Sequence, residues 1–284
     1  MKPAQFEYHA PTSLTEALEL LGTLEDVKVL AGGQSLIPIL ALRLSRFDHL
    51  VDLGRVAELR GVDRANGSVT VRAMTTQADV AADPTIADAV PLLPKATALI
   101  GHFQIRNRGT LGGSIAHADP SAEYPAVAVA LGAEMEIATR TGSRRVPAAE
   151  FFESTFMTAL ADDEVLTAVH FPVWVNAGFA VEEVARRHGD FAMAGVMAAV
   201  QVEGGRVQRS GLGLFGVAST PYRADPGIDG LAADDLDLGE IGGRVAADLD
   251  PPDDIHASGA YRRRVAAVLV ERALRTAIEE ATRG

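Results

Sequence analysis

The stretches Ala31-Gly32-Gly33-Gln34-Ser35 and Thr110-Leu111-Gly112-Gly113-Ser114 carry most of the information about the fold of this chain. Each combines two adjacent glycines with a hydroxyl side chain. Glycine permits positive φ angles and close approach, so that consecutive backbone N–H groups can surround an anionic oxygen. Either stretch alone also fits a strand end or a helix cap. Because the pattern occurs twice, we predict two phosphate cradles with unobstructed N–H groups, and hence a diphosphate ligand.

The composition is that of an ordinary soluble protein. The chain has 284 residues, of which 48% are hydrophobic, and this is enough for a sizeable core. Its formal net charge is −12, from 38 acidic and 26 basic side chains, so a polyanion would be repelled. The arginine runs are short and scattered. Nucleic-acid binding is therefore set aside.

The chain contains no cysteine. Disulfides, thiolate nucleophiles and cysteine-ligated iron–sulfur clusters within this chain are excluded, so any redox chemistry must use a bound cofactor. The N-terminus, Met1–Phe6, lacks an apolar signal core, and apolar stretches such as 126–133 fall short of the ~20 residues of a membrane span. We therefore expect a cytoplasmic protein.

The first part of the sequence has an α/β pattern. Ser13-Leu14-Thr15-Glu16 is typical of a capping box and predicts a helix that ends at Gly22. Residues 27–30 predict a buried strand leading into the first glycine stretch. Pro38 favours the first turn of a helix through Leu44, and a further strand is expected over 49–53. These elements predict a first subdomain over about residues 1–55.

A second subdomain is expected over 56–174. Asn66-Gly67 predicts a β-hairpin, and Thr75 or Thr76 can cap a helix through Ala82. Further elements are expected as follows: a buried helix within 90–100, a helix over 122–131, and strands over 134–139 and 164–171. The first domain then closes near Trp174.

The remainder, 175–284, predicts an antiparallel meander followed by helices. Strands are expected over 179–184, 192–202 and 206–217, the last two joined by a turn at Gly204-Gly205. Ser258 can cap the terminal helix, with arginines and glutamates off its buried face. The predicted buried stripe is Val265, Val268, Leu269, Ala273, Ala277 and Ile278. The fold class is thus α+β, with α/β subdomains before an antiparallel C-terminal domain.

Several constellations have a structural and a functional interpretation. The pattern Gly211-x-Gly213-x-x-Gly216 lacks the strand–helix context of a dinucleotide fingerprint and is interpreted as strand glycines that permit close packing. No pair among the seven histidines has helical metal-ligand spacing, so no metal site is expected. No hydrolytic triad can be proposed.

Three residues beyond the second glycine stretch are also candidates. His117 can be structural or can hydrogen-bond to a ligand. Asp119 and Glu123 fit helix N-terminal residues, or acceptors for ribose hydroxyls.

Blocks spread over the whole chain resemble the FAD-binding medium subunit of carbon monoxide dehydrogenase, xanthine dehydrogenase and related molybdenum hydroxylases. The blocks are Phe6–Ser13, Leu30–Pro38, Met74–Gln77, Gln104–Ser114, His117–Pro120 with Pro125, Arg186–Ala192 and Ser258–Arg262. The resemblance implies a domain of the vanillyl-alcohol-oxidase-like (PCMH/VAO) type over 1–174, followed by a C-terminal carbon monoxide dehydrogenase flavoprotein-like domain of antiparallel sheet and helices over 175–284.

The resemblance also implies which residues bind FAD. The implied set is Ala31, Gly32, Gly33, Gln34, Ser35, Leu36, Thr110, Leu111, Gly112, Gly113, Ser114, His117, Asp119, Glu123 and Leu166. The two glycine stretches would hold the pyrophosphate and neighbouring groups, His117, Asp119 and Glu123 would lie along the dinucleotide, and Leu166 would pack against it. No general acid or base and no metal ligand is implied.

The same resemblance implies partner chains: a small subunit with two [2Fe–2S] clusters and a large subunit with the molybdenum cofactor, as a dimer of heterotrimers. FAD would pass electrons to a quinone, dioxygen or NAD. Attachment to the inner membrane face would come only through partners. Two alternatives stay open: a stand-alone FAD-dependent oxidase or reductase of this fold, and a nucleotide-binding module without turnover. The substrate cannot be inferred from this chain.

Overall fold

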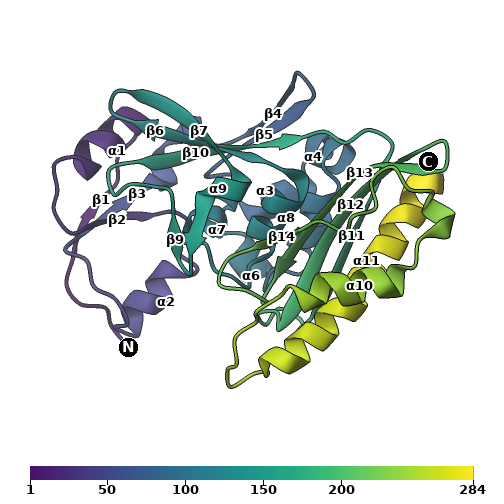
Figure 1. Cartoon of the computed structure of the whole chain (residues 1–284). Coiled ribbons are helices and arrows are strands. Elements are labelled where there is room, and N and C mark those ends of the chain that lie inside the picture. Colours follow the sequence, from purple (N-terminus) through teal and green to yellow (C-terminus); the bar gives the residue numbers. More distant parts are fainter. Residues whose placement is uncertain (284) are drawn as a thin grey trace.

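The computed structural model describes residues 1–283. Its elements form three blocks, each built on a sheet (Figure 1). A small N-terminal sheet lies at the left of the view, a five-stranded sheet crosses the top, and a four-stranded sheet backed by the long C-terminal helix lies at the right. No helix in the described part of the chain is both long and apolar enough to cross a membrane.

The N-terminal block is a parallel sheet in the order β1-β3-β2, formed by Glu7–His9, His49–Asp52 and Val27–Leu30. Helix α1 (Leu14–Leu21) begins as predicted, because the Ser13 hydroxyl accepts the N–H of Glu16. The Glu16 carboxylate caps the N–H of Thr12, one residue before the position of an ideal capping box. Helix α2 (Leu36–Ala41) has Pro38 in its first turn, as predicted, and ends before Leu44.

The second block is an antiparallel sheet in the order β4-β5-β10-β6-β7. The strands are Val62–Ala65, Ser68–Arg72, Val165–Pro172, Glu134–Thr139 and Gly142–Pro147. Two of the predicted strands, now β5 and β10, pair with each other, and the predicted hairpin turns at Asn66-Gly67.

Helices cover one face of this sheet, and a small hairpin follows it. The helices are α3 (Gln77–Ala82), α4 (Pro84–Ala89), α5 (Leu92–Thr97), α6 (Phe103–Arg106), α7 (Leu111–His117), α8 (Glu123–Leu131) and α9 (Ala148–Phe151). The hairpin is formed by β8 (Phe152–Ser154) and β9 (Met157–Thr158), and short 3-10 turns lie at Leu53–Arg55 and Ala57–Leu59. Helix α8 is buried on nearly all sides, which makes it the centre of the molecule.

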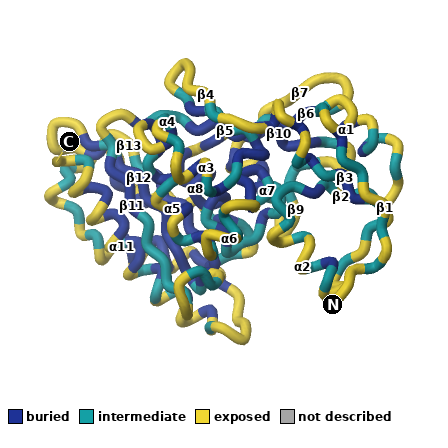
Figure 2. The backbone as a smooth tube through the Cα atoms, turned by 180° about the vertical axis from the view of Figure 1, so that it is seen from behind, coloured by how far each residue is buried: buried dark blue, intermediate teal, exposed yellow. Residues whose placement is uncertain are grey.

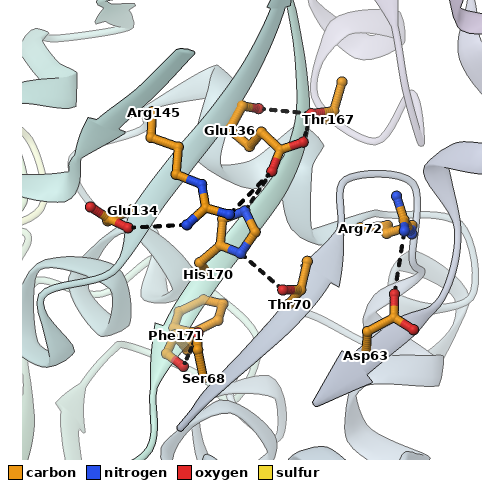
Figure 3. Close-up of polar contacts among 10 residues, drawn as sticks. All are labelled: Asp63, Ser68, Thr70, Arg72, Glu134, Glu136, Arg145, Thr167, His170 and Phe171. Carbon is orange, nitrogen blue, oxygen red and sulfur yellow. Dashed lines mark hydrogen bonds and ion pairs between the residues drawn. The ribbon is translucent and has the colours of Figure 1, made fainter. Parts of the chain in front are cut away.

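Polar side chains form a cross-strand network on this sheet (Figure 3). His170 on β10 contacts Thr70 on β5 through Nδ1 at 2.9 Å and the Glu136 carboxylate on β6 through Nε2 at 2.7 Å. Arg145 on β7 lies 3.7 Å from the same carboxylate. The alternation of β5 places Val69 and Val71 in the core and Thr70 between them on the opposite face. The side-chain hydrogen bonds of His170 with Thr70 and Glu136 therefore join three neighbouring strands and stabilise the sheet.

The third block is an antiparallel sheet in the order β11-β12-β13-β14, formed by Ala177–Val184, Ala194–Glu203, Arg206–Phe215 and Tyr222–Ala224. A short 3-10 turn (Ala233–Asp235), α10 (Leu238–Ala247) and α11 (Gly259–Arg283) follow. The predicted hairpin turn is confirmed, because Gly204 and Gly205 have φ angles of +57° and +74°.

The glycine pattern on β13 serves packing, as predicted. A Cβ added to Gly211 or Gly213 would overlap the carbonyl oxygens of Ala130 and Ala126 on helix α8. On β11, a Cβ at Gly178 would overlap the carbonyl oxygen of Ala277 on α11. Backbone from two helices thus approaches this sheet more closely than any side chain would allow.

The terminal helix departs from its predicted stripe in two places. Val268 is 45% exposed, whereas Arg262 is only 3% exposed. The two terminal nitrogens of Arg262 donate to the carbonyls of Met193 and Gly216 and to the Asp254 carboxylate, which offsets the cost of burying the charge, while Nε has no hydrogen-bond partner within residues 1–283. Periodicity alone cannot reveal such partners, which come from other parts of the chain.

The second and third blocks share one core (Figure 2). The buried cluster around α8 contains Val169 and Phe171 of the five-stranded sheet together with Phe179, Met197 and Phe215 of the four-stranded sheet. Burial is therefore continuous from one sheet to the other.

Candidate functional site

The two glycine stretches meet, although they belong to different blocks. A Cβ added to Gly32 would overlap the carbonyl oxygen of Arg108 and lie 2.7 Å from Cα of Gly109. A Cβ added to Gly113 would lie 3.2 Å from Cβ of Ala31. Only glycine permits this approach of the two backbones, so the pairing expected from the repeated pattern is present.

The first stretch is an open loop between β2 and α2. Gly33 has a φ of +73°, and the side-chain amide of Gln34 donates back to the carbonyl of Gly32 at 3.2 Å. Within residues 1–283, the N–H groups of 32–35 donate no hydrogen bond. Gln34 and Ser35 are exposed, while Leu36 begins the helix half-buried. The loop thus has the consecutive free amides of an anion nest.

The second stretch is the first turn of helix α7, and the prediction of unobstructed N–H groups is wrong here. Leu111 donates to Thr75 and Gly112 to Ala73, at 3.0 and 2.9 Å. Gly113 donates to the Thr110 hydroxyl at 3.0 Å, and Ser114 to the Thr110 carbonyl at 3.1 Å. The reason is twofold: Thr110 is a helix N-cap that accepts from Gly113 and Ser114, and the carbonyls of Ala73 and Thr75 accept from the two amides before them.

The glycines of this turn serve packing. A Cβ on Gly112 would overlap Ala73, whose Cα and carbonyl oxygen would lie 2.6 and 2.7 Å away. The half-buried Ser114 offers its hydroxyl, which makes no hydrogen bond within residues 1–283. The second stretch is therefore a tightly packed helix turn beside the open loop. Its remaining free hydrogen-bond donor is the Ser114 hydroxyl.

His117 and Asp119 follow at the end of helix α7. The ring of His117 lies 4.9 Å from that of Phe156, on the turn between β8 and β9. Burial lowers the pKa of His117, and Lys28 lowers it further, against the opposing effect of Asp119. The imidazole is therefore neutral at pH 7, with one nitrogen as donor and one as acceptor. Asp119 accepts the N–H of Ser121 at 2.8 Å, which fixes its carboxylate.

Glu123 and Glu183 are carboxyl groups held away from water. Burial, opposed by its own backbone N–H and helped by the charges of Glu183 and Asp119, raises the pKa of Glu123 to about 8. Burial also raises the pKa of Glu183 to about 7, and its Oε2 is buried without a hydrogen-bond partner within residues 1–283. Glu123 begins α8 and Glu183 lies on β11, so these acids lie where the two sheets meet. A protonated Glu123 offers an O–H donor.

Leu166 lies on β10 with 5% exposure and belongs to the core cluster around α8. The next residue, Thr167, lies at an irregularity of the strand and accepts the N–H of Ala73 at 2.8 Å. Ala73 in turn accepts the N–H of Gly112. Leu166 thus lies within the core, next to the residue whose backbone connects through Ala73 to the second glycine stretch.

A cavity of about 370 Å³ lies beside helix α6, away from the residues expected to bind FAD. It is lined by Gly101, His102, Phe103, Gln104, Arg106 and His188. The rings of His102 and His188 are 6.3 Å apart, and the left-handed Gly189 (φ +84°) brings the two segments together. The available signal was the family resemblance of the blocks 104–114 and 186–192, which contain the lining residues Gln104, Arg106 and His188.

The family follows from comparison with known proteins. A model described as "FAD binding domain in molybdopterin dehydrogenase" matches residues 4–174, and one described as "CO dehydrogenase flavoprotein C-terminal domain" matches 179–277. The chain belongs to the FAD-binding medium subunits of molybdenum hydroxylases. The fold expected from the resemblance, an FAD-binding domain followed by a domain of antiparallel sheet and helices, is confirmed.

Individual relatives align with this chain along almost their full lengths. The carbon monoxide dehydrogenase medium chain of Hydrogenophaga pseudoflava is 37% identical over 98% of both chains, and the glyceraldehyde dehydrogenase medium chain of Sulfolobus acidocaldarius is 36% identical over 97% of this chain and 99% of its own. A solved carbon monoxide dehydrogenase structure from H. pseudoflava matches with a TM-score of 0.96 and 38% identity, covering 99% of both chains. The chain is therefore a subunit of an FAD-dependent oxidoreductase.

Proposed function

We propose that this chain carries FAD as the electron-transfer station of a molybdenum hydroxylase, receiving electrons from the iron–sulfur clusters of a partner subunit and passing them to an external acceptor. The observation that carries the proposal is the open loop at 32–35, whose free amides lie against the firm turn that begins helix α7. An anion nest of this kind fits the pyrophosphate of a dinucleotide.

The residues proposed to hold FAD follow from this arrangement. The loop would hold the pyrophosphate through its amides and the Ser35 hydroxyl, with the second turn contributing mainly Ser114. Neutral His117 and protonated Glu123 supply donors, and Asp119 an acceptor, for the ribose and neighbouring groups. The proposed set is Ala31–Leu36, Thr110–Ser114, His117, Asp119, Glu123 and Leu166. Arg108, whose backbone contacts Gly32, joins this set as a cation at the edge of the cradle.

Bound FAD supplies the ability to accept single electrons and to release them singly or in pairs. The contribution of the chain is to bind the cofactor, fix its orientation and exclude water from its apolar side. Burial raises the pKa of Glu123 to about 8, so this acid is largely neutral at pH 7 and would add little negative charge beside the diphosphate.

The partner subunits are proposed to supply the iron–sulfur and molybdenum centres, since this chain has no cysteine to ligate a cluster. A dimer of heterotrimers, a cytoplasmic location and peripheral attachment to the inner membrane face through partners belong to the same proposal. We also propose two domains, 1–174 and 175–284, the first with subdomains of about 1–55 and 56–174. The gap between the two matched family models, after residue 174, supports this boundary.

The substrate of the complex does not follow from this chain. Relatives of nearly equal identity are named for carbon monoxide, glyceraldehyde and 6-hydroxypseudooxynicotine. The choice of substrate is therefore proposed to lie in a partner chain.

The test is to isolate the complex through a tag on this chain and to measure its flavin, molybdenum and iron content. We expect two further chains, one FAD per copy of this chain, and flavin bleaching by substrate only when the partners are present. Bleaching of the isolated chain by a small substrate would instead indicate a stand-alone flavoenzyme. Properly folded chain that takes up no FAD would refute the proposal and favour a module without turnover.

A further inference from the structure

The pairing of strands β1 and β3 brings together three metal-ligating side chains that are far apart in sequence. Glu7 lies opposite His49 in the parallel register, and His9 lies two residues after Glu7 on the same face of β1. One ligand atom from each of the three residues lies within 4.8 Å of the other two. The expectation that no metal site exists rested on helical spacing and did not consider pairing between strands.

The distances match those between ligands of one small cation. Nε2 of His9 lies 3.2 Å from Nδ1 of His49, which lies 3.6 Å from Oε2 of Glu7. Two ligands at about 2.05 Å from a tetrahedral zinc ion are about 3.3 Å apart. The same separation also fits a hydrogen bond between the two rings, so distance alone does not distinguish a metal from a proton.

The chemistry of the donor set selects the class of ion. Two imidazoles and a carboxylate suit Zn²⁺ and neighbouring late first-row divalent ions, whereas Mg²⁺ and Ca²⁺ prefer oxygen ligands only. The side chain of His49 is 20% exposed and that of Glu7 is 75% exposed, so an ion can enter from solvent, and water can complete the coordination. The chain has no thiolate that would compete for such an ion.

The place of the cluster in the fold suggests what an ion would do there. Strand β1 has three residues and lies at the edge of its sheet, and within residues 1–283 its one partner strand is β3. Strand β3 also pairs with β2, which leads into the open glycine loop.

We propose that Glu7, His9 and His49 form a binding site for a late first-row divalent cation, of the zinc class, that clips the N-terminal strand to its sheet. The proposal does not depend on FAD binding, because the three ligands lie on strands outside the proposed FAD set. An ion bound only in the folded state would stabilise it in proportion to the logarithm of its concentration.

The test uses the full-length FAD-loaded chain, freed of metal by EDTA and dialysis, and titrated with ZnCl₂ by calorimetry. We expect one high-affinity Zn²⁺ per chain, a higher Tm with zinc, and Co²⁺ absorption bands typical of tetrahedral coordination. H9A and H49A each remove one ligand and should weaken zinc binding by at least ~10-fold to 100-fold. Loss of a residue that only hydrogen-bonds to a metal ligand already has an effect of this size. H256A, which removes an exposed histidine elsewhere, should bind zinc like the unaltered chain.

Two results would overturn the proposal: no zinc uptake by the unaltered chain, or uptake that H9A and H49A leave undiminished. If either histidine variant fails to fold, E7Q decides, because Glu7 is exposed and its replacement should weaken zinc binding while the chain keeps its FAD. FAD content is measured throughout, so that failure of this site is distinguishable from failure of the flavin site.

Discussion

Two adjacent glycines and a serine occur in both the loop at 31–35 and the turn at 110–114, but the two stretches use their backbone N–H groups differently. In the loop, Gly33 is left-handed and the amides of 32–35 have no acceptor within residues 1–283. In the turn, Thr110 caps a helix and four consecutive amides are engaged. The repeated motif thus forms one loop with free amides, which we propose as the binding surface, and one helix turn whose amides are engaged.

The largest expected effect is a loss of stability when the helix turn at 110–114 is altered. In Gly112→Ala, the new Cβ overlaps backbone of Ala73, so helix α7 must move away from the five-stranded sheet. Overpacking of this kind costs about 3 kcal/mol or more, which corresponds to a loss in Tm on the order of 10 °C. Thermal unfolding followed by circular dichroism measures it.

The matched control is Gly243→Ala in helix α10, where an added Cβ meets nothing within 4 Å. Alanine should leave Tm unchanged or raise it slightly there, because alanine favours helix. Equal Tm values for Gly112→Ala and Gly243→Ala would show that the turn is not packed as described.

A smaller effect is expected from the loop. Gly33→Ala places a side chain at φ +73°, which costs about 1–2 kcal/mol and reorients the amides of the nest. Because a hydrogen bond to a charged group contributes about 1.5–3 kcal/mol, we expect FAD affinity to fall by at least ~10-fold while the chain stays folded. Fluorescence titration of the apoprotein with FAD measures the change.

Gly205→Ala is the control for strain, because Gly205 has nearly the same φ, +74°, at a hairpin turn with open space around it. Gly205→Ala should lower Tm by about as much as Gly33→Ala does, and it should leave the affinity for FAD unchanged. If both variants bind FAD equally well, the loop at 31–35 is not the cradle.

The last comparison concerns two acids where the sheets meet, Glu123 and Glu183, and its effect depends on pH. The pKa of Glu123 rises from 4.5 to about 8 on folding, so the folded state binds its proton more tightly than the unfolded state. Stability from this group is complete at low pH and decreases as pH rises from about 5 to 8, by at most ~1.4 kcal/mol per pH unit. Glu123→Gln cannot ionise and should flatten this decrease, as measured by urea unfolding at several pH values.

Some decrease should remain in Glu123→Gln, since the pKa of Glu183 is also raised, to about 7. The double variant with Glu183→Gln should be flattest, and Glu203→Gln, which alters an exposed acid, should behave like the unaltered chain. A pH dependence as steep in the double variant as in the unaltered chain would contradict this account.

Local signals in the sequence predicted most elements well. The capping residue Ser13, the Asn66-Gly67 turn and the strands at 27–30 and 134–139 appear where short-range chemistry places them. The same signals could not show which amides at 110–114 are engaged, because two of their acceptors, Ala73 and Thr75, lie more than thirty residues away in sequence. Adjacent glycines indicate that another part of the backbone comes close, but they do not identify which part of the chain it is.

Side chains whose partners are distant in sequence were likewise missed. Arg262 is buried because the carbonyls of Met193 and Gly216 accept from it. Glu7, His9 and His49 become neighbours only through strand pairing. Each case requires the tertiary fold, whereas the family resemblance rested on short blocks and so identified the fold without these contacts.

The core shared around helix α8 has a mechanical consequence. Glycines at 211 and 213 let the C-terminal sheet rest directly on the backbone of that helix, and the apolar cluster continues through both sheets. Large apolar interfaces suppress the hinge motions by which separate domains usually move. We therefore expect that the short segment between the two matched regions, 4–174 and 179–277, does not act as a hinge.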